Sequence, residues 1–306
     1  MIGPYGTLQA FRAALEARLR NVAQGRGTNL QRLQRRVAFE RLLARLFAQD
    51  DPPWLLKGGY ALELRLQDRS RSTLDLDLSV PDPERLKPSA MQGEGDSRAG
   101  LIHRCLQQAA EHDLGDGFEF LIRQPRGERT GAPGGGVRCS VQARLAGRPF
   151  ARFHLDVGLG DAVLDQPDWV EGSPLLSFAG IPAARVALYP VAQHFAEKVH
   201  AYTFPWQDRD NTRVKDLVDL VLLVDSGLLE PDRVQRALRA TFETRGTHFL
   251  PDRLPEPPVE WAEPYTALAQ DLGLPASTLQ EAHRYLEVYR QRWGLGQGIE
   301  SDHQRT

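Results

Sequence analysis

The segment Ser72–Val80 alternates leucine with aspartate, and this alternation constrains the fold more than any other feature of the sequence. Successive side chains of a β-strand project to opposite faces of a sheet. Asp75 and Asp77 therefore share one face, while the leucines at positions 74, 76 and 78 bury the other. A later segment, Phe150–Leu159, shows the same alternation, with Asp156 opposite its apolar side chains. We predict a half-buried sheet that carries three carboxylates on its polar face.

These three carboxylates indicate metal chemistry. Like charges on one half-buried face repel one another and are costly unless a cation lies between them. Two Mg²⁺ ions would supply that charge, because Mg²⁺ binds through a few carboxylates together with substrate phosphates. We therefore predict Asp75, Asp77 and Asp156 as metal ligands. The alternative for such a pattern is a set of strand aspartates that face solvent.

Lys57-Gly58-Gly59 precedes a predicted helix and forms the second candidate element of a site. A glycine pair at the start of a helix lets a phosphate approach free backbone amides, although a Gly-Gly pair alone also fits an ordinary turn. Fifteen residues separate Gly59 from Asp75. The order of glycine pair, helix, Asp-x-Asp strand and later Asp strand is what metal-dependent nucleotidyl transfer requires. It supplies a cradle for an anion, metal ligands and a third carboxylate beside the acceptor hydroxyl.

The hydrophobic periodicity predicts an α+β chain, with a mixed sheet in a core of residues 1–188 and a helical part over residues 189–306. Two helices open the chain, the second over about residues 29–49. The core adds a helix at Leu101–His112, a strand at Phe118–Arg123 and a hairpin of Val137–Leu145 with Phe150–Leu159. Beyond Pro190 we predict helices at about 190–204, 213–225, 231–243 and 276–293.

Basic residues are concentrated at the amino-terminal end. Residues 1–50 hold nine arginines against three acidic residues, a net charge of +6 in a chain whose total is −2. Such a segment can steer a polyanion, or it can be a solvated helix face. Five of these arginines are predicted on the outer face of the second helix: Arg32, Arg35, Arg36, Arg41 and Arg45.

Four motifs resemble a known family, the AbiEii/AbiGii toxins of the polymerase-β-type nucleotidyltransferases. They are the Lys-Gly-Gly-Tyr-Ala-Leu of Lys57–Leu62, the Arg-Ser-Thr-Leu-Asp-Leu-Asp-Leu of Arg71–Leu78, Glu197-Lys198, and the Arg-Val-Lys-Asp-Leu-Val-Asp-Leu of Arg213–Leu220. The family usually has a small hydroxyl residue after the glycine pair, where this chain has Tyr60. The resemblance implies a polymerase-β-like nucleotidyltransferase core.

The resemblance also implies roles for individual residues. Asp75 and Asp77 would be catalytic and hold Mg²⁺, and Lys198 and Asp216 would complete the catalytic group from the helical part. The NTP would be bound by Lys57, Gly58, Gly59, Arg71 and Thr73.

Several of these roles have alternatives. Arg71 could instead neutralise the nearby aspartates, and Lys198 could pair with His194 or lie on the surface. Lys215 and Asp219, four residues apart on a helix, could pair with each other.

As implied by the resemblance, the chain would be the toxin of a toxin–antitoxin (abortive infection) pair. It would transfer a nucleoside monophosphate from an NTP to RNA, at the 3′ end of tRNA, release pyrophosphate and have a cognate antitoxin protein as partner. The alternatives are nucleotidylation of a protein or a small molecule, and a catalytically silent binding module. Two cysteines, no signal-peptide pattern and no membrane-length apolar run predict a cytoplasmic protein with no membrane partner.

Overall fold

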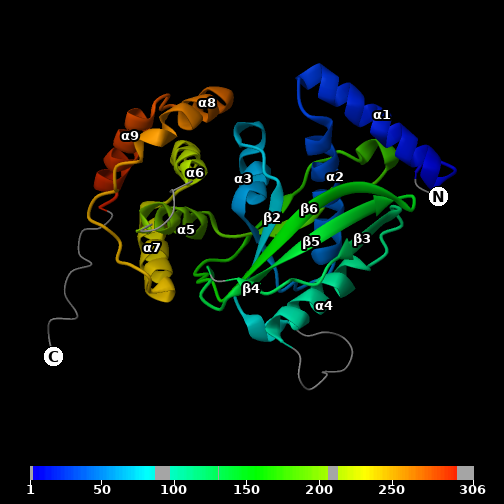
Figure 1. Ribbon diagram of the computed structural model, residues 1–306, viewed down its shortest axis with the longest axis horizontal. Helices are drawn as coiled ribbons and strands as arrows, with labels where there is room; N and C mark the ends of the chain where they lie inside the picture. The colour runs from blue at the N-terminus through cyan, green and yellow to red at the C-terminus, as the bar shows by residue number, and fades with distance from the viewer. Residues whose placement is uncertain (1–2, 87–96, 130, 206–212, 295–306) are drawn as a thin grey trace. The chain divides into compact units, whose positions relative to one another are not determined.

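The computed structural model describes residues 3–86, 97–129, 131–205 and 213–294, and the chain forms two compact units (Figure 1). The sheet unit comprises Met1–Arg65, Ser72–Asp161 and Pro167–Tyr189. The helical unit comprises Leu66–Arg71, Ala162–Gln166 and Pro190–Thr306. The predicted boundary between two domains at residue 188 stays a prediction.

A mixed sheet forms the centre of the sheet unit, as the alternating patterns predict (Figure 1). Its strands follow the order β3-β5-β6-β2-β1-β8-β7, with β4 paired to β5. The β2–β6 and β1–β8 pairs are parallel and the other pairs are antiparallel. The strands are β1 Leu55–Lys57, β2 Asp75–Val80, β3 Phe118–Ile122, β4 Glu128–Arg129, β5 Gly136–Leu145, β6 Arg148–Leu159, β7 Asp168–Glu171 and β8 Arg185–Leu188.

Helices cover the apolar face of this sheet. Phe153, Leu155 and Val157 of β6 are buried, as their alternation predicts, and the ring of Phe153 meets that of Phe39 on α2 at a centroid distance of 4.8 Å. Helix α4 packs on β3 and β5. The helices of the sheet unit are α1 Leu8–Arg26, α2 Leu30–Leu46, α3 Gly58–Leu66 and α4 Arg98–Ala110.

The strand that carries the two aspartates is shorter than predicted. It begins at Asp75 rather than at Ser72, and Leu74, expected in the core, is 58% exposed. Leu76 and Leu78 are fully buried. The exposure of Leu74 follows from its position before the first residue that pairs with β6.

Five helices form the helical unit: α5 Val191–Thr203, α6 Val214–Asp225, α7 Pro231–Arg245, α8 Ala262–Leu272 and α9 Leu279–Arg292, counted over the ranges that the structure describes. Four of them were predicted, and α8 was not. Within residues 3–86, 97–129, 131–205 and 213–294, no helix is long and apolar enough to cross a membrane.

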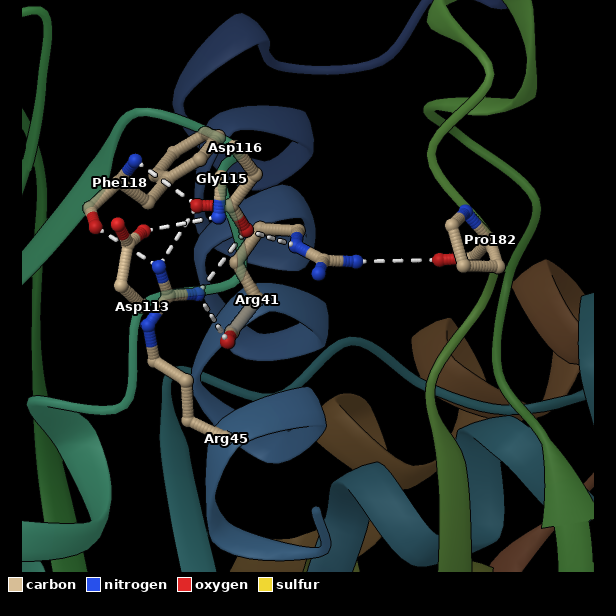
Figure 2. Close-up of polar contacts among 7 residues, drawn as sticks. All are labelled: Arg41, Arg45, Asp113, Gly115, Asp116, Phe118 and Pro182. Atoms are coloured by element: carbon tan, nitrogen blue, oxygen red, sulfur yellow. Dashed lines mark hydrogen bonds and ion pairs between the residues drawn. The ribbon is translucent and has the colours of Figure 1, made fainter. Parts of the chain in front are cut away.

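Two of the five arginines expected on the outer face of α2 are buried, which corrects that prediction. Figure 2 shows Arg41 and Arg45 reaching Asp116 in the turn before β3. The Nε of Arg41 lies 2.7 Å from a carboxylate oxygen of Asp116, and a terminal nitrogen of Arg45 lies 2.6 Å from the other. Arg45 also donates to the carbonyl of Phe118, and Arg41 to that of Pro182. These side chains therefore join α2 to two distant segments of the sheet unit.

The helical periodicity explains why these arginines are inside. Arg41 and Arg45 continue the four-residue spacing of the buried Leu33 and Val37, so all four share one face of α2. Burial raises the pKa of Asp116, but the hydrogen bond and charge of Arg45 outweigh it and hold the pKa below its usual value. Asp116 is thus ionised and is the countercharge that both buried guanidinium groups share.

Asp116→Asn should lower the free energy of unfolding by about 3 kcal/mol, because it leaves two buried guanidinium groups without a countercharge. Asp113→Asn is the matched control. Asp113 lies in the same turn but is exposed and accepts a hydrogen bond from the amide of Gly115, so its replacement should cost less than about 0.5 kcal/mol. Urea unfolding of both variants measures the difference, and equal losses would contradict a buried ionic anchor.

Candidate active site

The three predicted carboxylates meet on the polar face of the sheet. Asp75 and Asp77 project from β2, and Asp156 projects from β6, the parallel neighbour of β2. Asp77 pairs in register with Asp156, and Asp75 with His154. All three carboxylates are half-buried. The two strands therefore place the three side chains on one small area of the sheet.

Arg138 supplies a positive charge between these carboxylates, and the sequence analysis missed it. It lies on β5, directly opposite Asp156. Its guanidinium donates to both carboxylate oxygens of Asp156, each at 2.8 Å, and to Asp75 at 2.7 Å. Burial lowers the pKa of Arg138, but the hydrogen bond and charge of Asp156, with Asp75 and Asp77, raise it overall. The alternation of β5, in which Val137 and Cys139 are buried on either side of Arg138, would have placed this arginine on the polar face.

The donor set suits a magnesium ion that arrives with a phosphate substrate. Among the residues described, no group of three or more His, Cys, Asp and Glu side chains is placed to hold one ion. Mg²⁺ is typically held by one or two carboxylates, with substrate phosphates and water completing its coordination. Asp75 and Asp77 offer such oxygens from one strand. Asp75 accepts one hydrogen bond from Arg138, whereas both oxygens of Asp156 accept from it. Asp156 as a metal ligand stays a prediction.

Gly58 brings the glycine turn into contact with Asp77. Its φ of +67° lies in the left-handed region, and a Cβ built on it would overlap the carboxylate of Asp77. Helix α3 begins at Gly58, and the first amides of a helix have no partner within the helix. An anion at this turn would therefore meet free amides directly beside Asp77.

The two residues that flank the glycine pair are held by buried carboxylates. Lys57 donates to Asp161 at 2.5 Å, and the hydroxyl of Ser79 donates to the same carboxylate oxygen. Tyr60 is fully buried, and its hydroxyl donates to Glu40 at 2.7 Å. Burial raises the pKa of Glu40. The residue that replaces the family's small hydroxyl side chain is therefore a core residue.

A second cluster of charged residues lies in the helical unit. The amine of Lys198 on α5 lies 2.6 Å from Asp216 and 2.8 Å from Asp219, both on α6. Arg71 binds Asp219 through two hydrogen bonds of 2.9 and 2.7 Å. Burial lowers the pKa of Lys198, but the charges of Asp216 and Asp219 raise it well above its usual value, so the amine is protonated.

This cluster decides between the alternatives that the sequence left open. Lys198 is neither a surface residue nor bound only to His194, because Asp216 and Asp219 hold it. Asp219 is fully buried and binds Arg71 and Lys198, whereas Lys215 is exposed. Thr73 donates to the carbonyl of Asp75 at 3.2 Å. The roles of Arg71 and Thr73 in NTP binding stay predictions.

Gly58→Ala should destabilise the sheet unit because the new methyl group overlaps the carboxylate of Asp77. Gly147→Ala is the matched control: Gly147 has a φ of +72°, but a Cβ there meets nothing within 4 Å. Both variants bear the cost of a left-handed alanine, about 1 kcal/mol. We expect Gly58→Ala to lose about 2 kcal/mol more than Gly147→Ala in urea unfolding, as overpacking does. Equal losses in the free energy of unfolding would mean that the side chain of Asp77 moves aside at no cost.

Comparison with known proteins agrees with this geometry. The sequence model of the family described as "Nucleotidyl transferase AbiEii toxin, Type IV TA system" matches residues 41–289. Among solved structures the chain is similar to MenT4, a nucleotidyltransferase toxin from Mycobacterium tuberculosis H37Rv, with a TM-score of 0.53 and 20% identity over 91% of this chain and 96% of that chain. This likeness shows that the chain shares the fold of that toxin, an α+β fold with a mixed sheet. No curated protein matches the chain. The chain belongs to the AbiEii family of nucleotidyltransferase toxins of type IV toxin–antitoxin systems.

Proposed function

We propose that this nucleotidyltransferase is Mg²⁺-dependent and transfers a nucleoside monophosphate from an NTP to an RNA acceptor, at the 3′ end of tRNA. One observation carries the proposal: Gly58, at the start of α3, lies against the carboxylate of Asp77, on the strand that also presents Asp75. An anion-binding turn and two metal-binding carboxylates are thus adjacent, as transfer from a triphosphate requires.

The glycine turn, the two aspartates and Arg138 of the sheet unit have different roles in the proposed reaction. The free amides of the Gly58-Gly59 turn bind and orient the triphosphate. Asp75 and Asp77 would hold Mg²⁺, which neutralises charge that develops on the phosphate oxygens. Arg138 fixes the carboxylates of Asp75 and Asp156 in place before substrate binds.

The helical unit is assigned its role from the family motif. Lys198 and Asp216 match the Glu-Lys and Arg-x-Lys-Asp motifs, and we propose that the protonated amine of Lys198 binds phosphate during transfer. Its contacts with Asp216 and Asp219 keep that amine charged in a buried place. Asp219 binds the amine directly, and Arg71 in turn binds Asp219.

The partners follow from family membership. A type IV toxin implies a cognate antitoxin. We propose that this antitoxin is a protein encoded beside this chain. We also propose that the chain acts in the cytoplasm. Transfer to a protein or a small molecule is the competing activity on the same site. A catalytically silent binding module is the competing class of protein.

Asp77→Asn should lower nucleotidyl transfer at least about a hundredfold, because it removes a metal-binding charge from the site. The test incubates the purified chain with Mg²⁺ and each α-labelled NTP, with total RNA or total protein as acceptor. We expect label in the RNA fraction, lost with a chelator and in Asp77→Asn.

Glu119→Gln is the matched control, since Glu119 is an exposed carboxylate on the same sheet, on β3. It should transfer at the wild-type rate. Label that enters only the protein fraction would contradict the RNA acceptor. Wild-type rates in Asp77→Asn would remove Asp77 from the site.

Lys198→Gln should lower both turnover and stability. Asp216 and Asp219 would lose their shared partner, and the loss of one member of a buried ionic group costs about 3 kcal/mol. Lys215→Gln, an exposed lysine of α6, is the matched control and should change neither. Turnover is measured at a temperature where each variant is folded by circular dichroism. A folded Lys198→Gln protein with wild-type turnover would show that the lysine is structural.

A further inference from the structure

A hollow of about 500 Å³ opens on the sheet unit beside Asp75. Its lining comes from α2, from the residue before β2 and the first residue of β2, from the residue after β3, and from β5 and β6. The side chains that matter for its chemistry are Arg35, Leu74, Asp75, Arg123, Arg152 and His154. None of Lys57, Gly58 and Gly59 lines it, so it is distinct from the glycine turn.

The ionisable side chains that line the hollow are basic apart from one carboxylate. Three arginines and one histidine line it, and Asp75 is the one acidic residue of its lining. Within the described part of the chain, the guanidinium groups of Arg35, Arg123 and Arg152 form no ion pair with a carboxylate. Arg123 and Arg152 are exposed and Arg35 is half-buried. The positive charge is therefore available to a ligand.

The strand register arranges these basic groups in a track that leads away from Asp75. His154 stands opposite Asp75 on one side and Ser140 on the other, and its ring lies 3.3 Å from the Asp75 carboxylate. Two residues earlier on the same strand is Arg152, and the amide of Arg123 donates to the carbonyl of Ser140. A ligand in the track would lie with one end at Asp75.

We infer that this hollow binds backbone phosphates of the acceptor RNA strand and so directs its terminal hydroxyl to Asp75. The inference rests on the proposed function. Guanidinium groups are well suited to phosphate, and a basic groove that follows a backbone is how proteins hold single strands. The hollow reaches Asp75 but not the glycine turn, so it fits the acceptor rather than the triphosphate. Leu74, 58% exposed, offers an apolar surface to a base.

The five arginines of α2, predicted on its outer face, do not form one basic surface. Arg41 and Arg45 are buried against Asp116, and Arg36 binds Glu63 at 2.7 Å. Arg35 is the member of that row that lines the hollow. The remaining basic groups of the hollow are Arg123, which directly follows β3, and Arg152 and His154 on β6.

The test compares the double variant Arg123→Gln/Arg152→Gln with Arg144→Gln. Arg144 is also an exposed arginine, on β5, but it does not line the hollow. Affinity for a short single-stranded RNA of fixed sequence is measured by fluorescence anisotropy without NTP, across a salt series. We expect the double variant to bind about tenfold more weakly at low salt, with the slope of log affinity against log salt smaller by about 1.4, or 0.7 for each lost phosphate contact. Arg144→Gln should match wild type.

Kinetics then separate this inference from the proposed function. The KM for RNA should rise in the double variant while the KM for NTP stays constant, and its melting temperature should be unchanged because both arginines are exposed. If wild type labels RNA and the double variant has the same salt slope and the same KM for RNA, the hollow is not the acceptor site, although the proposed function stands. A raised KM for NTP alone would assign the hollow to the nucleotide and overturn the inference. A wild-type chain that neither binds nor labels RNA would overturn both.

Discussion

The charge balance on the polar face of the sheet is the constraint on which the site depends. Three half-buried carboxylates on two neighbouring strands would repel one another, and Arg138 offsets this by binding Asp75 and Asp156 together. The arginine is held in turn by its place on β5, opposite Asp156 in the antiparallel ladder. Asp77 is the carboxylate that meets the glycine turn. The face is therefore assembled before any ligand binds.

The glycine turn at the start of α3 is held in place on two sides, by β2 at the site and by α2 in the core. On the site side, the absence of a side chain at Gly58 lets α3 begin in contact with Asp77. On the core side, Tyr60 and Glu40 fasten the same helix to α2 through a buried hydrogen bond. Because α2 is fixed to the turn before β3 by Asp116, the position of the glycine turn is tied to packing across the sheet unit. Side chains outside the proposed site thus determine where the groups of the site lie.

Local periodicity predicted much of this molecule. The alternation in β2 and β6 placed Asp75, Asp77 and Asp156 on one face, and the family motifs predicted the nucleotidyltransferase core. The helical spacing after Pro190 predicted four helices of the helical unit, but α8, in which only Tyr265 and Ala269 are buried, was not predicted.

The partners of charged residues could not be predicted in the same way. Arg45 and Asp116 are 71 residues apart, and Arg71 and Asp219 are 148 apart, so their pairing is decided by tertiary packing. From the sequence alone, the five arginines of α2 are expected on one exposed surface of the helix. The structure divides them among a buried anchor, a pair with Glu63 and the hollow beside Asp75.

We propose that Asp75 and Asp77 hold a divalent metal together with the triphosphate. Electron paramagnetic resonance of Mn²⁺, used in place of Mg²⁺, measures this directly with a non-hydrolysable NTP analogue. With two protein carboxylates on offer, bound Mn²⁺ should rise when the analogue is added to the wild-type chain and should not rise in Asp75→Asn. Equal Mn²⁺ binding by the wild-type and Asp75→Asn proteins, with and without the analogue, would contradict the account.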